Sequence, residues 1–121
     1  MIKIRDIFSM DLASPKGELI EIWDLPDQES VELNVRVVIG FDGTNYEEVF
    51  DTCVITGLCI RKYDAELQSI PYDGKVFRFH RFASGEIKHA MVSAIQACHR
   101  PTVDECIHEL RKIMFWDFEG L

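Results

Sequence analysis

Four histidines are the residues of this sequence best suited to acid–base chemistry: His80, His89, His99 and His108. A ribonuclease of the acid–base kind needs two imidazoles and a cation around one phosphate group. His80, which has arginines nearby in the sequence, could supply one imidazole, and His89 with Lys88 could supply the second imidazole and the cation. Because the spacing does not single out these residues, a surface position explains the four imidazoles more simply.

Two cysteines with histidines close by raise a second possibility, the binding of zinc. Cys98-His99 is followed by Cys106 and His108, and thiolate sulfur and imidazole nitrogen are typical ligands of structural zinc. Helical periodicity argues against this grouping, because it puts both cysteines on apolar stripes and both histidines on other faces. The sequence also has no C-x-x-C pair. We therefore expect buried, reduced thiols, no metal and no cofactor.

Further catalytic motifs are missing from the sequence. The seven glycines are isolated, so no phosphate-binding loop is present, and no Gly-x-Ser-x-Gly turn occurs. No apolar run approaches the roughly 20 residues of a membrane span, and the first residues lack the apolar core of a signal peptide. We therefore expect a cytoplasmic protein that is not an enzyme and does not contact a membrane.

The distribution of charge is the most informative chemical feature. The formal net charge is −8, which argues against a protein that binds nucleic acid by cancelling phosphate charge. Residues 11–51 contain eleven acidic and two basic side chains, whereas residues 61–100 contain seven basic and four acidic ones. An acidic field of this kind can steer a basic protein partner toward the surface, although charge alone also fits a solvated face that aids solubility. We expect the partner to contact these carboxylates: Glu18, Glu21, Asp24, Asp27, Glu29, Glu32, Glu47, Glu48 and Asp51.

A β-hairpin carries the end of this acidic region. Residues 31–41 alternate between apolar and polar side chains at period two. Asp42-Gly43 is a favoured hairpin turn, and residues 46–56 are rich in strand-forming residues. Shorter strands are predicted at residues 2–8 and 75–82. Residues 19–23 could be a short strand or a loop, and residues 57–69 a short helix.

Two helices are predicted to close the chain. The first begins at Ser84, a plausible N-cap, and the second begins after Thr102, which starts a capping box with Glu105. Aromatic residues of the tail 115–119 should pack back onto the core, Trp116 among them, while Trp23 could be buried or could anchor an interface. The sequence thus predicts one α+β domain over residues 1–121. We expect an antiparallel-rich sheet of about four to five strands with two C-terminal helices packed on it.

Several of these pieces, taken in order, resemble the immunity protein 8 family of bacterial polymorphic toxin systems. The resemblance covers residues 20–120 and rests on an acidic entry with a proline, two strand segments and a C-terminal aromatic run. These are Trp23-Asp24-Leu25-Pro26, Val38-Ile39-Gly40, Phe50 to Thr56, and Leu110 followed by Trp116-Asp117-Phe118-Glu119. The chain departs from the family at residues 57–60, where a proline and a tryptophan are usual, and at its last residue, where a tyrosine is usual.

The resemblance implies an α+β protein without catalytic activity that binds one cognate toxin. Such toxins are often the C-terminal domains of contact-dependent growth inhibition proteins, and many are nucleases with basic clefts. The mechanism would be stoichiometric occlusion of the cleft by carboxylates, which agrees with the acidic region found above. Two alternatives remain open: a small RNA-processing enzyme that uses His80 with neighbouring basic residues, and an adaptor that binds another basic protein.

Overall fold

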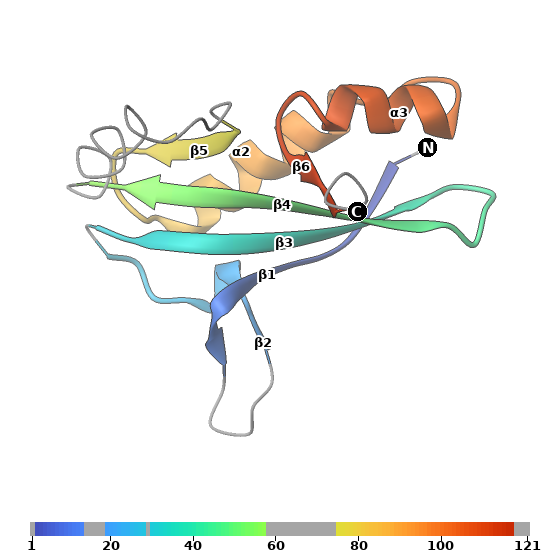
Figure 1. The fold of residues 1–121 in the computed structure, drawn as a ribbon. Coiled ribbons are helices and arrows are strands. Elements are labelled where there is room, and N and C mark those ends of the chain that lie inside the picture. The colour runs from blue at the N-terminus through green and yellow to red at the C-terminus, as the bar shows by residue number, and fades with distance from the viewer. Residues whose placement is uncertain (1, 14–18, 29, 58–74, 118–121) are drawn as a thin grey trace.

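A computed structural model of the chain describes residues 2–13, 19–28, 30–57 and 75–117, and shows an α+β fold with two helices on one face of a sheet (Figure 1). This confirms the predicted fold class. None of the helices in these ranges has the length and apolar character needed to cross a membrane. The elements in chain order are β1 (Ile2–Ala13), β2 (Leu19–Glu21), the 3-10 helix η1 (Ile22–Asp24), β3 (Glu32–Phe41), β4 (Glu47–Thr56), β5 (Val76–Phe79), α2 (Ser84–Gln96), α3 (Val103–Leu110) and β6 (Phe115–Trp116).

Within the described residues the sheet has six strands, where about four to five were predicted, and it is mostly antiparallel, as predicted. Its order is β2-β1-β3-β4-β5, and β6 pairs with β4. Only β4 and β5 run parallel among these pairs. The short β6 returns from the end of α3 and brings Trp116 opposite Phe50. This pairing connects the aromatic tail to the centre of the molecule.

The β3–β4 hairpin is the clearest agreement between sequence and structure. Nine residue pairs join its strands, with Val37 opposite Phe50 near the middle. Gly43 in the turn has a φ of +79°, which a glycine adopts without the steric cost that a side chain brings. Thr44 closes the turn, because its N–H and its hydroxyl both donate to the Phe41 carbonyl. The predicted Asp42-Gly43 turn and both strands are confirmed.

The two faces of the sheet have different surroundings. Side chains of alternate residues on β3 and β4, such as Val35, Val37 and Phe50, are fully buried in one core with the apolar stripes of α2 and α3. Met91 of α2 and Leu110 of α3 belong to that core. The intervening residues of the strands point to the opposite face, where few side chains are fully buried. We call the face that packs against α2 and α3 the helix face, and the opposite face the open face.

The start of α2 differs from the prediction. Ser84 is the first helical residue, and Ala83 stands at the N-cap with no side-chain hydrogen bond. The acceptor is instead Asp27, whose Oδ1 receives the Ser84 N–H at 3.0 Å. Ser84 as N-cap was therefore wrong, because a carboxylate from a remote loop takes the role that a local hydroxyl was expected to fill.

Other predicted elements change in extent. β1 continues beyond residue 8 to Ala13, and residues 19–23 divide into β2 and η1. β5 is shorter than the predicted strand, because Phe82 leaves the sheet to form a bridge with Gln28. The helix predicted at residues 57–69 lies, apart from its first residue, outside the described residues.

Candidate functional site

The carboxylates of the predicted acidic interface come from several elements of the fold. Glu18 and Glu29 lie outside the described residues. The other seven carboxylates fall into three groups along the chain: Glu21, Asp24 and Asp27 from β2 to the loop after η1, Glu32 at the start of β3, and Glu47, Glu48 and Asp51 in the first half of β4. Four of these seven are exposed: Asp24, Asp27, Glu32 and Glu47. The proposed contact residues therefore have to be considered group by group.

Asp51 is already paired within the protein. It lies opposite Arg36 in the β3–β4 ladder, and its two oxygens accept from Arg36 Nε at 3.0 Å and Nη2 at 3.3 Å. Asp117, just after β6, approaches the same guanidinium at 3.5 Å. The hydrogen bond with Asp51 raises the pKa of Arg36 above its usual value. On this part of the open face the single positive charge of Arg36 offsets one of these two negative charges.

Glu48 has a different environment on the helix face. Its Oε2 accepts the indole N–H of Trp116 at 2.9 Å. Trp116 is half-buried and packs against the core, which agrees with the prediction that the tail aromatics fold back. The guanidinium of Arg111 lies 5.6 Å from the centre of the Trp116 ring, a distance suited to a cation–π interaction. The indole therefore orients one carboxylate while its ring contacts a cation.

A groove of about 500 Å³ opens beside this pair, between the hairpin end and the first turns of α3. The hairpin contributes Thr44, Tyr46 and Glu48, α3 contributes Val103, Asp104 and Ile107, and β6 contributes Trp116. Of these seven residues, two are acidic and none is basic. Tyr46 is 64% exposed, which is unusual for a large aromatic side chain that serves only the core. We call this cavity the hairpin–α3 groove.

Contacts in the first turn of α3 hold this helix, which forms one wall of the groove. At its start, Thr102 accepts the Glu105 N–H at 3.2 Å and its hydroxyl donates to Glu105 Oε1 at 3.0 Å. This confirms Thr102 as the N-cap of the predicted capping box, with Glu105 bonded to the Thr102 hydroxyl where a capping box uses the Thr102 backbone N–H. Asp104 stands in the same first turn, where the partial positive charge of the helix end favours a carboxylate. One wall of the groove is thereby fixed with an acidic group at its rim.

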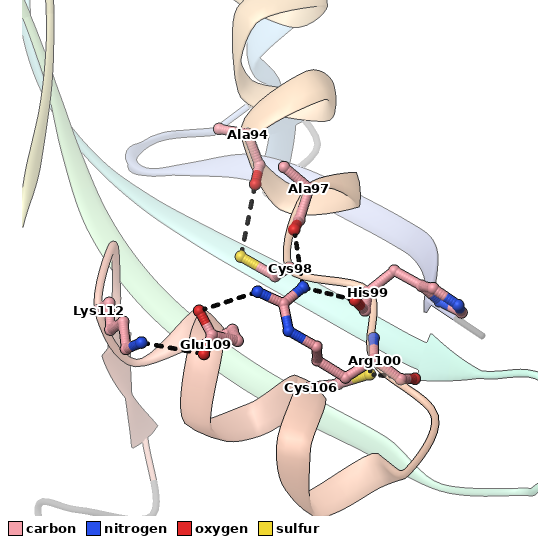
Figure 2. Close-up of polar contacts among 8 residues, drawn as sticks. All are labelled: Ala94, Ala97, Cys98, His99, Arg100, Cys106, Glu109 and Lys112. Carbon is pink, nitrogen blue, oxygen red and sulfur yellow. Dashed lines mark hydrogen bonds and ion pairs between the residues drawn. The ribbon is translucent and has the colours of Figure 1, made fainter.

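A cluster of polar contacts fixes the corner between α2 and α3 (Figure 2). The Arg100 guanidinium donates to the carbonyls of Ala97 at 3.2 Å and His99 at 2.6 Å, and it lies 3.4 Å from Glu109 Oε2. Glu109 Oε1 accepts from Lys112 Nζ at 2.9 Å, and this hydrogen bond lowers the pKa of Glu109. Arg100 thus ties the end of α2 to the body of α3.

The two cysteines near this corner belong to the core, as predicted. Cys98 and Cys106 are buried, and burial raises the pKa of the Cys98 thiol. Cys106 Sγ accepts the backbone N–H of Arg100 at 3.3 Å. Within the described ranges, no three His, Cys, Asp or Glu side chains are grouped so that they could hold a metal ion.

Three of the histidines are exposed and come from different segments of the chain. His80 follows β5, His89 is on the exposed side of α2, and His108 is on the exposed side of α3. The carbonyl of His80 accepts a hydrogen bond from Gly57, a backbone role that leaves the imidazole outside the core. The three imidazoles are thus exposed on three different segments of the chain.

Six of the seven groove residues were absent from the predicted interface, among them Tyr46, Asp104 and Trp116. Trp116 was assigned to the core alone, whereas it packs against the core and also lines the groove. Tyr46 precedes the two glutamates of β4 directly, and an aromatic residue beside a turn and two acids is a signal that could have been noticed. Asp104 lies between Thr102 and Glu105, and its place in the first turn of a helix already explains an acidic residue there.

Comparison with known proteins supports the resemblance noted in the sequence. The model of the family described as immunity protein 8 matches residues 5–120, nearly the full length of the chain. The matched range includes the hairpin, both helices and β6, and therefore every residue of the groove. No curated protein and no solved structure matches the chain.

Proposed function

The chain belongs to the immunity protein 8 family, and from this premise we propose that it neutralises a basic nuclease domain by covering the cleft in which that domain binds nucleic acid. Family membership makes the chain an immunity protein against a polymorphic toxin. It also indicates an inhibitor that acts by binding a protein, not by catalysis. The finer proposal adds the chemistry of the toxin and the part of this surface that meets it.

The observation that carries the proposal is the acidic and aromatic hairpin end. Glu48 and Asp104 line the groove together with Tyr46 and Trp116, and Glu47 is exposed at the next position of β4, on the open face. Carboxylates of this kind can pair with the lysines and arginines that a nuclease uses to hold phosphates. Aromatic side chains beside them would supply the apolar contact that anchors an interface.

The other predicted carboxylates have different parts in this proposal. Asp24, Glu21 and Glu32 add to the negative field that accelerates the approach of a basic domain. Asp27 has a hydrogen bond to α2 and Asp51 an ion pair with Arg36, so both contribute to the fold as well as to the field. We place direct contact with the toxin at Glu47, Glu48 and the groove.

The toxin is proposed to be the C-terminal domain of a contact-dependent growth inhibition protein that acts in the cytoplasm. Such a domain would be encoded next to this chain, so it can be cloned and tested. The immunity protein and the toxin should form a stable one-to-one complex, and nucleic acid should be unable to enter the occupied cleft.

A charge-reversal experiment with a matched control tests this proposal. Glu47→Lys with Asp104→Lys reverses one strand carboxylate and one first-turn carboxylate at the hairpin end. Asp6→Lys with Glu86→Lys does the same on β1 and in the first turn of α2. Both variants carry the same net charge of −4, four units less negative than the natural chain.

Co-expression with the toxin domain gives the readout. We expect the first variant to lose protection of the cell and to bind the toxin more weakly, while the second variant keeps both. If the two variants protected equally well, the hairpin end would not be the contact surface. If the natural chain neither bound the neighbouring toxin domain nor protected against it, the proposal of a basic nuclease partner would be refuted.

A further inference from the structure

We infer that the hairpin–α3 groove is a binding pocket for a single arginine side chain of the toxin. This inference rests on the proposed function and adds the chemical identity of the group that enters the groove. It follows from the composition of the groove walls, from the way Glu48 is held and from a contact that the chain makes with its own Arg111.

The walls of the groove match the two parts of an arginine side chain. Val103, Ile107 and the aromatic rings offer apolar surface to the three methylene groups of the stem. Glu48 and Asp104 offer carboxylates to the guanidinium from two different elements, β4 and α3. A cation would thus meet negative charge on both sides, and none of the seven lining residues would repel it.

Glu48 is oriented before any ligand arrives. Its Oε2 accepts the Trp116 indole N–H at 2.9 Å, which restricts the rotation of the carboxylate. A carboxylate that is already oriented loses less side-chain entropy when it accepts a further hydrogen bond. The Trp116–Glu48 pair is therefore a prepared acceptor at the side of the groove.

The geometry favours arginine over lysine. A guanidinium is planar, stacks on aromatic rings and donates two parallel hydrogen bonds to a carboxylate, whereas an ammonium is a compact and strongly hydrated charge. Trp116 already receives one guanidinium, that of Arg111, at 5.6 Å. Arg111 is not among the residues that line the groove, so its contact is an example of a guanidinium over this ring from outside the groove lining. Tyr46, exposed at the rim, offers a second ring.

Titration with short peptides tests the inference independently of the toxin. The probe is acetyl-Gly-Arg-Gly-amide, and its neutral counterpart carries citrulline, which has nearly the same shape but no charge. The signal is the indole N–H resonance of Trp116 in ¹⁵N-labelled protein, with Trp23 as an internal reference. The Trp116 signal is assigned with the Trp116→Phe variant.

We expect the arginine peptide to shift the Trp116 resonance in a saturable way, with a half-saturation concentration about tenfold below that of the citrulline peptide. The corresponding lysine peptide should lie between them. Glu48→Gln with Asp104→Asn should raise the half-saturation for the arginine peptide by about tenfold. Glutamine at position 48 still accepts the indole N–H, so this variant is expected to fold. The control Asp6→Asn with Glu86→Gln carries the same net charge and should leave the titration unchanged.

Three results would overturn the inference: equal affinity for the arginine and citrulline peptides, equal affinity of the two double variants for the arginine peptide, or no saturable shift of Trp116. The toxin domain separates this outcome from a failure of the proposed function. A toxin that binds the natural chain and the Glu48→Gln, Asp104→Asn variant equally tightly would refute the arginine pocket while the immunity function stands. A toxin that does not bind the natural chain would refute the proposed function.

Discussion

The contact between Asp27 and α2 gives the sharpest test of how the acidic region is built. Asp27 was predicted to face a partner, yet its carboxylate accepts the Ser84 N–H at 3.0 Å across 57 positions of sequence. The first N–H groups of a helix have no partner within the helix. Since Ala83 has no side chain that could accept them, Asp27 fills the role of a capping residue from outside the helix.

Replacing Asp27 with alanine should therefore destabilise the fold by about 1 kcal/mol, the typical cost of losing a capping oxygen. Unfolding entropy is about 2.1 cal/mol/K per residue, so for a chain of this length about 1 kcal/mol corresponds to a Tm lower by about 4 °C. In urea the midpoint should fall by about 0.5 M if the slope is about 2 kcal/mol per molar.

Two variants separate capping from charge. Asp27→Asn removes the charge but keeps an oxygen of similar capping strength, so we expect it to retain most of the stability. Asp24→Ala removes an exposed carboxylate from η1, and its effect should stay within about 0.5 kcal/mol. Thermal and urea unfolding followed by circular dichroism measure all three proteins. The account of α2 would be refuted if Asp27→Ala were no less stable than Asp24→Ala, or if Asp27→Asn were as unstable as Asp27→Ala.

Three further predictions concern α3, which forms one wall of the groove. Thr102→Ala should lower the free energy of unfolding by about 1 kcal/mol, measured in urea, because the capping box is lost; an unchanged urea midpoint would contradict this. Leu110→Ala should cost roughly 2–5 kcal/mol, because its fully buried side chain leaves a cavity, and a loss below about 1 kcal/mol would show that the core collapses around the site. Glu109→Gln should lower the Tm at pH 7, because the hydrogen bond from Lys112 lowers the pKa of Glu109. The ionised carboxylate therefore stabilises the fold above its unfolded pKa of about 4.3. This contribution is lost as the pH falls through the lower pKa of the folded state. The Tm difference between Glu109→Gln and the natural chain should thus close in acid, and a difference independent of pH would refute the ion-pair explanation.

The parts of the fold that could be predicted are those governed by local patterns. Alternation at period two, together with Asp42-Gly43, was enough to place the β3–β4 hairpin, because register and turn are set by residues close in sequence. The capping box at Thr102 was readable for the same reason. In each case the physical cause of the element is contained within about a dozen residues.

The parts that could not be predicted depend on contacts between distant residues. The cap of α2 comes from Asp27, and the orientation of Glu48 comes from Trp116, 68 positions away. β6 has only two residues, too few to show any periodicity. The groove exists because these contacts bring the hairpin, α3 and the tail together, so its residues have no common signature in the sequence.

The acidic region shows the limits of charge counting. Composition identified an excess of carboxylates in residues 11–51, but it could not distinguish Asp51, paired with Arg36, from Glu47, which is exposed. Nor could it include Asp104, which lies outside that range and joins the hairpin end only after folding. The interface remains a proposal whose residues are now chosen by position in the fold.

The most direct test of the central claim is the association rate of the purified chain with the neighbouring toxin domain, measured by stopped flow as ionic strength is varied. For the natural chain and for Asp6→Lys with Glu86→Lys, we predict a rate constant that falls by about tenfold or more from low salt to 0.5 M salt. For Glu47→Lys with Asp104→Lys we predict a slow rate with little dependence on salt. Two results would contradict the claim that the hairpin end receives a basic toxin. One is an association rate constant of the natural chain that does not change with salt. The other is an identical salt dependence of the rate constant in both variants.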